Sequence, residues 1–451
     1  MPSSTPSITT KFETLDRLKK LSRQVDSWTH EVTVGEIVSV GPTTLKAEFH
    51  RLGLGAICRL LSGKSKGTLM EVIALEGPIA TMSVFGNAND ISVGDRIEYV
   101  SDGLEFDFDP TWLGSVLDGT GKPLMALPAT AANPTKLKAV IKESVPALAR
   151  PVIDQPMQTG VYAIDLFVAL GRGQRIALFG PPGCGKSMLL ASVIANSSAD
   201  VVVMALIGER GREVQEFLQR HIPERVRRKT VMIVATSDRP ALERAYAAHV
   251  ASSVAESYRD AGKNVLLLVD SLTRTARAYR EIGLAAGEPA VRRGYPASVY
   301  PALPQIIERA GKTEAGSITA IYAVLVEGDS ASDPIADEIK SLTDGHIELN
   351  RDLAAASLYP AIDVVKSLSR VMDDIVSSEQ LEASRHSRRL LAKYDEIKLL
   401  IQIGEYEQGQ DAEADEAVSK IEALRAVIHR SSNQRVAPMR SMLADLRKAL
   451  R

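Results

Sequence analysis

The fold of this chain is decided by the stretch Leu178-Phe179-Gly180-Pro181-Pro182-Gly183-Cys184-Gly185-Lys186-Ser187, which Met188-Leu189-Leu190 follows. An apolar strand comes first, then the pattern G-x-x-x-x-G-K-S, then the start of a helix. Strand, glycine loop and helix in this order are the context in which the pattern forms a phosphate-binding P-loop. A chance glycine turn is the alternative, and the agreement of all three elements argues against it. The stretch therefore predicts a site for a nucleoside triphosphate.

Each residue type in the loop has a chemical reason. Gly180, Gly183 and Gly185 let the backbone bend so that successive N–H groups point at phosphate oxygens. The helix that follows adds the partial positive charge of its N-terminus. Lys186 supplies a charge for the β- and γ-phosphates, and Ser187 supplies a hydroxyl for the Mg²⁺ that accompanies the nucleotide. The residues predicted to bind the nucleotide in this stretch are Gly180, Gly183, Cys184, Gly185, Lys186, Ser187 and Met188.

The composition is that of an ordinary globular protein whose 451 residues suffice for roughly three domains. Its 54 basic and 56 acidic residues leave no positive surplus, so no nucleic acid partner is expected. Cys58 and Cys184 lie far apart in the sequence and are expected to be reduced thiols. The N-terminus has no hydrophobic signal region, and the longest apolar runs are too short to span a bilayer. We therefore expect a cytoplasmic protein, or one at most peripheral to a membrane.

The first 150 residues divide into three segments of different sequence pattern. Residues 1–30 form a tail, in which residues 11–27 have the spacing of an amphipathic helix that could dock on a partner or a membrane. A helix packed on its own domain is an equal alternative. Residues 31–100 consist of short alternating segments between glycine turns (GEIVSVG, TLKAEF, GAICRLL, LMEVIAL, IATMSVF and DRIEYV), which predict a small β-barrel. Residues 101–150 are rich in turns and are interpreted as a connector.

The second half predicts a sheet and then helices. From 151 to 375, strand-like runs such as RIALFG, VVVMALIG, TVMIVATS, NVLLLVD and ITAIYAVLVE alternate with helical segments. This alternation is typical of an α/β core with a mostly parallel sheet covered on both faces. Residues 376–451 are charged, leucine-containing helical sequence, interrupted at Gly404, Gly409 and Pro438. We expect a C-terminal helical domain there.

Two further apolar strands end in charged residues. Residues 265–269 are followed by Asp270, a Walker B arrangement that places a carboxylate on the Mg²⁺ side of the phosphates. Residues 201–207 are followed by GERGRE, in which a carboxylate could polarise the attacking water and a guanidinium could hold charge on phosphate. A solvated charged turn that opens a helix remains the alternative for the second segment.

Longer strings point to a family. The strings IGERGREVQEF, ATSDRPALERA, DSLTRTARAYREIGLAAGEP, GYPASVYPALPQIIERAG, DGHIELNR and YPAIDVVKSLSR resemble the ATPase of the type III protein export apparatus. That family serves flagella and injectisomes and is similar to the catalytic subunit of rotary ATP synthases. The resemblance covers about residues 31–451 and is strongest over 150–375. It implies a RecA-like P-loop core between the small β-barrel and the C-terminal helical domain.

The resemblance also implies roles for single residues. Glu209 would be the catalytic carboxylate that orients or activates water, with Arg210 beside it at the phosphates. Asp270 would support the Mg²⁺ shell, with Arg274 as a second basic residue of the site. Two more roles follow from the last string: an adenine contact for Tyr359, with interface packing as its alternative, and an arginine finger donated to the neighbouring subunit for Arg370, with a surface salt bridge as its alternative.

The implied function is a homohexameric, Mg²⁺-dependent ATPase that releases chaperones from export cargo and unfolds that cargo. It would use ATP and Mg²⁺ at the inner-membrane face of a secretion apparatus. The implied partners are a central stalk protein touching residues 283–296, a stator or regulator at the N-terminus, and secretion chaperones with effector cargo. Overall resemblance favours an injectisome over a flagellar export ATPase. A catalytic subunit of a rotary ATP synthase and a ring-shaped RNA translocase are the other candidates.

Cys184 departs from the residue types that are usual at its P-loop position. Because it lies beside Lys186 and a helix N-terminus, we expect its thiolate to be favoured. That expectation raises the possibility of oxidative inactivation.

Overall fold

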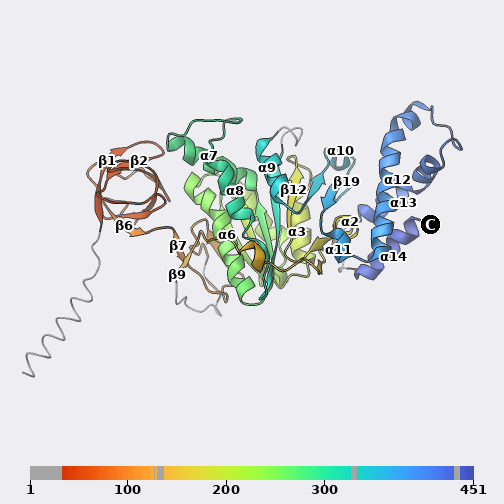
Figure 1. Cartoon of the computed structure of the whole chain (residues 1–451), viewed down its shortest axis with the longest axis horizontal. Helices are drawn as coiled ribbons and strands as arrows, with labels where there is room; N and C mark the ends of the chain where they lie inside the picture. The colour runs from red at the N-terminus through yellow and green to blue at the C-terminus, as the bar shows by residue number, and fades with distance from the viewer. Residues whose placement is uncertain (1–32, 126, 129–136, 327–332, 431–436) are drawn as a thin grey trace, which may run out of the picture.

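The computed structural model describes residues 33–125, 127–128, 137–326, 333–430 and 437–451. Along its longest axis it places a β-barrel at one end, a sheet flanked by helices in the middle and a group of helices at the other end (Figure 1). This arrangement confirms the predicted fold class. The expected tail and amphipathic helix of residues 1–30 lie outside the described residues. Within those ranges no helix is both long and apolar enough to cross a membrane.

The six strand-like segments near the N-terminus close into a barrel in the order β1-β2-β5-β4-β3-β6. In β2 the apolar Leu45 and Ala47 are buried while Lys46 and Glu48 are exposed, as expected when one face of a strand lines a barrel interior. The barrel strands are β1 (Val34–Val40), β2 (Leu45–Glu48), β3 (Ile57–Leu60), β4 (Leu69–Glu76), β5 (Ile79–Val84) and β6 (Arg96–Ser101). Each of these six strands overlaps one of the six segments that the sequence predicts over residues 31–100.

The barrel contacts the central domain through aromatic and polar side chains. The rings of Phe85 and Tyr246 meet edge to face with centroids 5.2 Å apart. Glu71 of β4 hydrogen-bonds to Tyr246, and burial raises the pKa of its carboxyl to about 7 despite that bond. Its Oε2 atom is buried with no hydrogen-bond partner among the described residues. The ionised form of Glu71 is therefore unfavourable in the folded chain.

Replacing Glu71 with glutamine is expected to stabilise the protein at pH 8 and to change little at pH 5. The folded carboxyl titrates near 7 and the unfolded one near 4.5, so unfolding releases a proton between these values and stability falls as the pH rises through them. The gain at pH 8 should be about 1–3 kcal/mol, the cost of a buried group without its partner. Urea unfolding at both pH values measures it. Glu76→Gln, an exposed change on the same strand, is the control, and an unchanged pH dependence in Glu71→Gln would contradict the argument.

The connector contains strands that the sequence did not reveal. Strand β7 (Glu105–Asp107) pairs with β9 (Leu137–Ala139), and β8 (Val116–Asp118) joins the central sheet parallel to β14. These strands are only three residues long, so their periodicity is too short to detect. A short helix, η1 (Ala147–Ala149), follows before the central domain.

The central sheet has the order β19-β18-β12-β17-β15-β13-β14-β8 and is parallel except for β19, which runs antiparallel to β18. The short β16 (Gly311–Lys312) also belongs to this sheet and pairs antiparallel with β17 off this path. The five strands predicted from apolar runs are all present. The strands are β12 (Arg175–Gly180), β13 (Val201–Ile207), β14 (Thr230–Ala235), β15 (Asn264–Asp270), β17 (Ser317–Leu325), β18 (Gly345–Leu349) and β19 (Ile362–Ser369).

Both faces of this sheet are covered. All seven residues of β13 are buried: Val202, Met204 and Leu206 belong to the same hydrophobic cluster as the buried residues of α3, and the alternate residues belong to the cluster of α6. The helices of the core are α2 (Tyr162–Phe167), α3 (Lys186–Asn196), α4 (Gly211–Glu216), α5 (Glu224–Arg227), α6 (Ala241–Asp260), α7 (Leu272–Ala285), α8 (Val299–Ile307), α9 (Pro334–Leu342), α10 (Arg351–Ala355) and α11 (Met372–Ile375). The pair β10 (Pro156–Met157) and β11 (Leu170–Gly171) lies before the P-loop strand.

The chain ends in three helices, α12 (Ser378–Ile403), α13 (Ala412–Ile428) and α14 (Met439–Ala449). Gly404 ends α12 with a φ of 78°, a left-handed conformation that favours glycine. Asp411 caps α13 by accepting from the N–H groups of Glu413 and Ala414, and Pro438 precedes α14. The predicted interruptions in the helical sequence are therefore confirmed.

Candidate functional site

The P-loop connects β12 to α3, as the sequence predicts. Gly183 and Gly185 have φ values of 84° and 80°, so both use the left-handed region that turns successive N–H groups toward one point. A Cβ atom on Gly185 would lie 2.9 Å from Cε1 of Tyr359, so this position also needs glycine for space. The loop backbone and the start of α3 form a cradle that fits phosphate.

At Gly180 the structure adds a packing reason for glycine to the expected one. This residue belongs to β12, and a Cβ atom there would lie 3.0 Å from Cβ of Leu349 on the neighbouring strand β18. Glycine at this position therefore lets two strands and the loop pack closely, while Gly183 and Gly185 provide the bend.

The structure brings Lys186, Ser187 and Asp270 to the same edge of the sheet. Lys186 Nζ lies 2.5 Å from Asp270 Oδ1, and the two side chains are only 11% and 4% exposed. Asp270 is the last residue of β15, which is separated from β12 by β17 alone, so the parallel strands deliver their C-terminal ends to one place. The serine hydroxyl and the carboxylate are oxygen ligands of the kind that Mg²⁺ prefers.

Glu209 follows the end of β13 and faces the same place. Arg274 of α7 holds it, with Nη2 at 3.1 Å from Oε2 of Glu209 and Nη1 donating to the carbonyl of Gly208. Burial raises the pKa of Glu209 to about 7, and the charge of Asp270 acts in the same direction. Arg274 and Lys186 oppose this rise. A carboxyl that titrates near neutral pH is suited to accept a proton or orient a water molecule.

A cavity of about 310 Å³ opens beside these residues. Glu213, Phe217 and His221 line it and follow one another at intervals of four residues, so they share one face of α4 and of its continuation η2 (Phe217–His221). The other lining residues are Ser187, Leu206, Glu209, Val214, Glu216 and Asp270. Phe217 and His221 receive no role from the sequence alone, although their spacing at successive intervals of four residues after Glu213, within and just after the string IGERGREVQEF, is a pattern that places all three on one helix face.

Two predicted site residues point elsewhere. The side chain of Arg210 is 80% exposed and lies 3.1 Å from Glu213 Oε1, so its guanidinium pairs with this carboxylate and not with the P-loop. Met188 lies in the first turn of α3 with an exposed side chain. Any contact of Met188 with phosphate would use its backbone N–H.

Tyr359 lies against the P-loop, in the segment between α10 and β19. Its ring occupies the space that a Cβ atom on Gly185 would need, its hydroxyl donates to the carbonyl of Ala354 at 3.4 Å, and the residue is 46% exposed. An exposed aromatic face beside a phosphate cradle fits the predicted contact with a nucleotide base.

Arg370 lies where the parallel strands begin, whereas the P-loop lies where they end. It follows β19, whose last residue, Ser369, pairs with Gly345 at the start of β18. The backbone N–H of Arg370 donates to the carbonyl of Asp344, which itself pairs with Arg175 at the start of β12. The P-loop begins about five residues further on, roughly 16 Å along the strand. The side chain of Arg370 is exposed, so it is not engaged with the P-loop of its own chain.

Cys184 does not have the environment expected from the sequence. The residue is only 2% exposed, and burial raises the pKa of its thiol even though Arg351 lowers it. The expectation of a favoured thiolate is therefore wrong, because desolvation of the side chain outweighs the nearby positive charges.

Thiol-specific reagents are accordingly expected to leave ATPase activity unchanged during short exposure at neutral pH. Cys58 is also buried, and burial raises its pKa to about 12, so neither thiol presents an accessible thiolate. Residual activity after treatment, compared with a Cys184→Ala variant, measures this. Rapid inactivation of the wild type alone would contradict the burial of Cys184.

The phosphate cradle, the lysine and carboxylate pair and the half-buried Glu209 together define a P-loop nucleoside triphosphatase. The chain matches the model for the ATP synthase alpha/beta family, nucleotide-binding domain, over residues 160–369. It matches the model for the T3SS EscN ATPase C-terminal domain over residues 376–448. A type 3 secretion system ATPase of Xanthomonas euvesicatoria is 45% identical over 403 residues, which cover 89% of this chain and 90% of that protein.

Solved structures of the same family of ATPases are also similar to this chain. The assembled ATPase EscN from the enteropathogenic E. coli type III secretion system has a TM-score of 0.87 and 43% identity, covering 92% of this chain and 100% of that one. EscN in complex with its central stalk EscO has a TM-score of 0.85 and 42% identity, over 92% of this chain and 100% of that one. The chain belongs to the family of type III secretion system ATPases, and it is an ATPase.

Proposed function

We propose that this chain forms a homohexameric ring that hydrolyses ATP with Mg²⁺ at the interfaces between its subunits. The observation that carries the proposal is the placement of Arg370 at the sheet edge opposite the chain's own P-loop, with its side chain exposed. One chain thus holds half of a site, and the arginine is positioned to serve another copy. The similar ATPase EscN was solved in an assembled form, which supports an assembly of subunits here as well.

Each proposed role follows from the geometry of the first half-site. The P-loop N–H groups and Lys186 bind the phosphates, and the ring of Tyr359 packs on the adenine. Ser187 and Asp270 would hold Mg²⁺, which supplies charge neutralisation at the β- and γ-phosphates. Glu209, held by Arg274, orients the attacking water and accepts its proton. Arg210 reaches the phosphates only if it leaves Glu213.

The partners follow from exposed surfaces and from the relatives. The segment 283–296 joins α7 to α8 and exposes Leu284 and Val291 near Arg292 and Arg293, a mixed surface suited to a central stalk protein such as the one seen with EscN. Leu399, Leu400 and Ile403 are exposed at the end of α12 and could receive secretion chaperones and effector cargo. The ring would release and unfold this cargo at the inner-membrane face of the apparatus. The stator or regulator contact stays assigned to the N-terminal tail.

The dependence of rate on protein concentration tests the proposal. ATPase activity per subunit should rise steeply with concentration and reach a plateau once rings form, because an isolated subunit lacks the donated arginine. Size measurements by light scattering at each concentration show whether the rise follows assembly, and Lys186→Ala provides the background rate. Full activity per subunit in samples that contain only monomers would overturn the proposal.

A further inference from the structure

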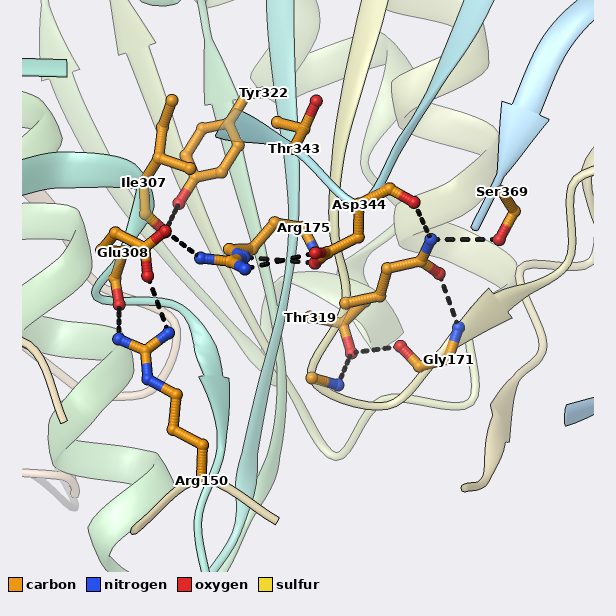
Figure 2. Close-up of polar contacts among 12 residues, drawn as sticks. Arg150, Gly171, Arg175, Ile307, Glu308, Thr319, Tyr322, Thr343, Asp344 and Ser369 are labelled. Carbon is orange, nitrogen blue, oxygen red and sulfur yellow. Dashed lines mark hydrogen bonds and ion pairs between the residues drawn. The ribbon is translucent and has the colours of Figure 1, made fainter. Parts of the chain in front are cut away.

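A chain of charged and polar side chains crosses the amino-terminal edge of the central sheet, away from the P-loop (Figure 2). Arg150 lies 2.8 Å from one oxygen of Glu308 through Nη1, and it also donates to the backbone carbonyl of Glu308. The other oxygen of Glu308 lies 2.5 Å from Nη1 of Arg175. Arg175 in turn binds Asp344. Glu308 follows α8, Arg175 begins β12 and Asp344 lies in the turn between α9 and β18, so these contacts connect three parts of the core.

Asp344 is tied to the first residue of the P-loop strand by four hydrogen bonds. Its carboxylate accepts from the backbone N–H of Arg175 at 3.0 Å, from Nε at 3.1 Å and from Nη2 at 3.2 Å. Its own N–H donates to the carbonyl of Arg175 at 2.8 Å. Such a two-pronged arginine–carboxylate contact fixes direction as well as distance.

The same residue holds the backbone of Arg370. The carbonyl of Asp344 accepts from the N–H of Arg370 at 2.9 Å and from Nε2 of Gln174 at 3.2 Å. Gln174 also donates to Oγ of Ser369 at 3.0 Å, and this hydroxyl donates to the carbonyl of Ala169. Arg370 is therefore held by Asp344, and Gln174, the residue before β12, contacts both Asp344 and Ser369.

The charged side chains of this network are only partly shielded from water, with exposed fractions of 20% for Arg150, 24% for Asp344 and 36% for Glu308. The side chain of Arg175 is 17% exposed, and although burial lowers its pKa, Asp344 and Glu308 outweigh this effect and raise it overall. Removing the charge of Asp344 leaves Arg175 with Glu308 as its remaining carboxylate partner, so the guanidinium is free to shift toward Glu308. The carboxylate of Asp344 is thus a determinant of local geometry.

We propose that Asp344 is the positioning residue of Arg370: it joins the strand that ends in a subunit's own P-loop to the arginine that the subunit presents to the next site. This inference rests on the proposed role of Arg370 as a donated finger. Arg370 is exposed, and Asp344 contacts only its backbone. Asp344 therefore fixes the position of the Arg370 backbone and leaves the guanidinium free to reach a neighbouring subunit. Glu308 and Arg150 extend the link to α8, the helix that follows residues 283–296.

Asp344→Asn tests the role in purified rings. Asparagine keeps the size and the backbone contacts but cannot compensate the guanidinium of Arg175. We expect kcat to fall by about 10- to 100-fold, since a misplacement of about 1 Å can cost on the order of 10²-fold. The KM for ATP should stay within about 2-fold, because the P-loop that binds ATP is intact. The matched control is Asp200→Asn at the same sheet edge, where Asp200 accepts from Asn264 without touching the Arg370 segment.

Mixed rings separate an effect on the finger from an effect on the subunit's own P-loop. Asp344→Asn subunits have an intact P-loop, and Lys186→Ala subunits have an intact finger. Rings that contain both, purified through two tags, should recover activity that neither variant shows alone. Rings of Arg370→Ala with Lys186→Ala test the donated finger itself. Recovery in the Arg370 mixture without recovery in the Asp344 mixture overturns the positioning role, whereas failure of the Arg370 mixture overturns the proposed function.

Arg175→Lys covers the case in which Asp344→Asn does not fold. Lysine keeps the charge but lacks the fork that binds Asp344, so we expect the same loss confined to kcat, smaller in size. An Arg175→Lys or Asp344→Asn ring with normal kcat, whether or not its melting temperature is lowered, would show that the contacts are structural only and would overturn the inference.

Discussion

Replacing Arg370 with alanine is expected to lower kcat for ATP hydrolysis by about 10³-fold or more while the protein still binds ATP and still assembles. A donated arginine stabilises charge on the phosphoryl group only in the transition state and contributes on the order of 10³–10⁵ to the rate. The exposed position of Arg370, away from its own P-loop, predicts no loss of ATP affinity. Steady-state kinetics and equilibrium binding of a fluorescent ATP analogue measure the two effects separately.

The controls for this experiment come from the same chain. Arg389 is an exposed arginine on α12, and Arg389→Ala should keep normal kcat. Arg370→Lys keeps the charge but loses the planar fork, so it should recover only part of the rate. If Arg370→Ala lowered activity only by dissociating the rings, light scattering would show smaller particles, and the catalytic role would be contradicted.

The half-site around the P-loop could be predicted from the sequence because its parts follow from local pattern. Strand ends in a parallel sheet meet at one edge, so the apolar runs that end before Glu209 and at Asp270 already place both carboxylates near Lys186. The six barrel strands and the interruption at Gly404 are likewise visible in short-range periodicity and turn residues. In each case the signal lies within one short segment of the chain.

The features that the sequence did not reveal depend on contacts between distant segments. Nothing near Cys184 in the sequence indicates that packing buries its thiol, and the packing reason for glycine at Gly180 is Leu349 on another strand. The link from Arg175 to Asp344 joins residues 169 positions apart. Charged residues of this kind look like an ordinary solvated surface until the fold places them together.

Replacing Glu209 with glutamine is expected to lower kcat by about 10²- to 10⁴-fold, the usual contribution of a positioned general base. Glutamine keeps the size and can still accept from Arg274, but it cannot take up a proton. Binding of ATP should persist because the P-loop and Lys186 are unchanged. Glu216→Gln, a change in another carboxylate that lines the cavity, is the matched control and should retain most of the activity.

The pH profile distinguishes a catalytic Glu209 from a structural one. Its pKa of about 7 means that the carboxylate forms as the pH rises through neutrality, so kcat/KM should rise through about pH 7. Arg274 lowers that pKa, so Arg274→Gln should move the rise to higher pH. The phosphates of ATP also titrate near this range, but they do so equally for every variant, so the difference between the profiles isolates Glu209. Identical profiles for wild type and Arg274→Gln would contradict the assignment, since a guanidinium 3.1 Å from the carboxylate of Glu209 must change the pKa of that group.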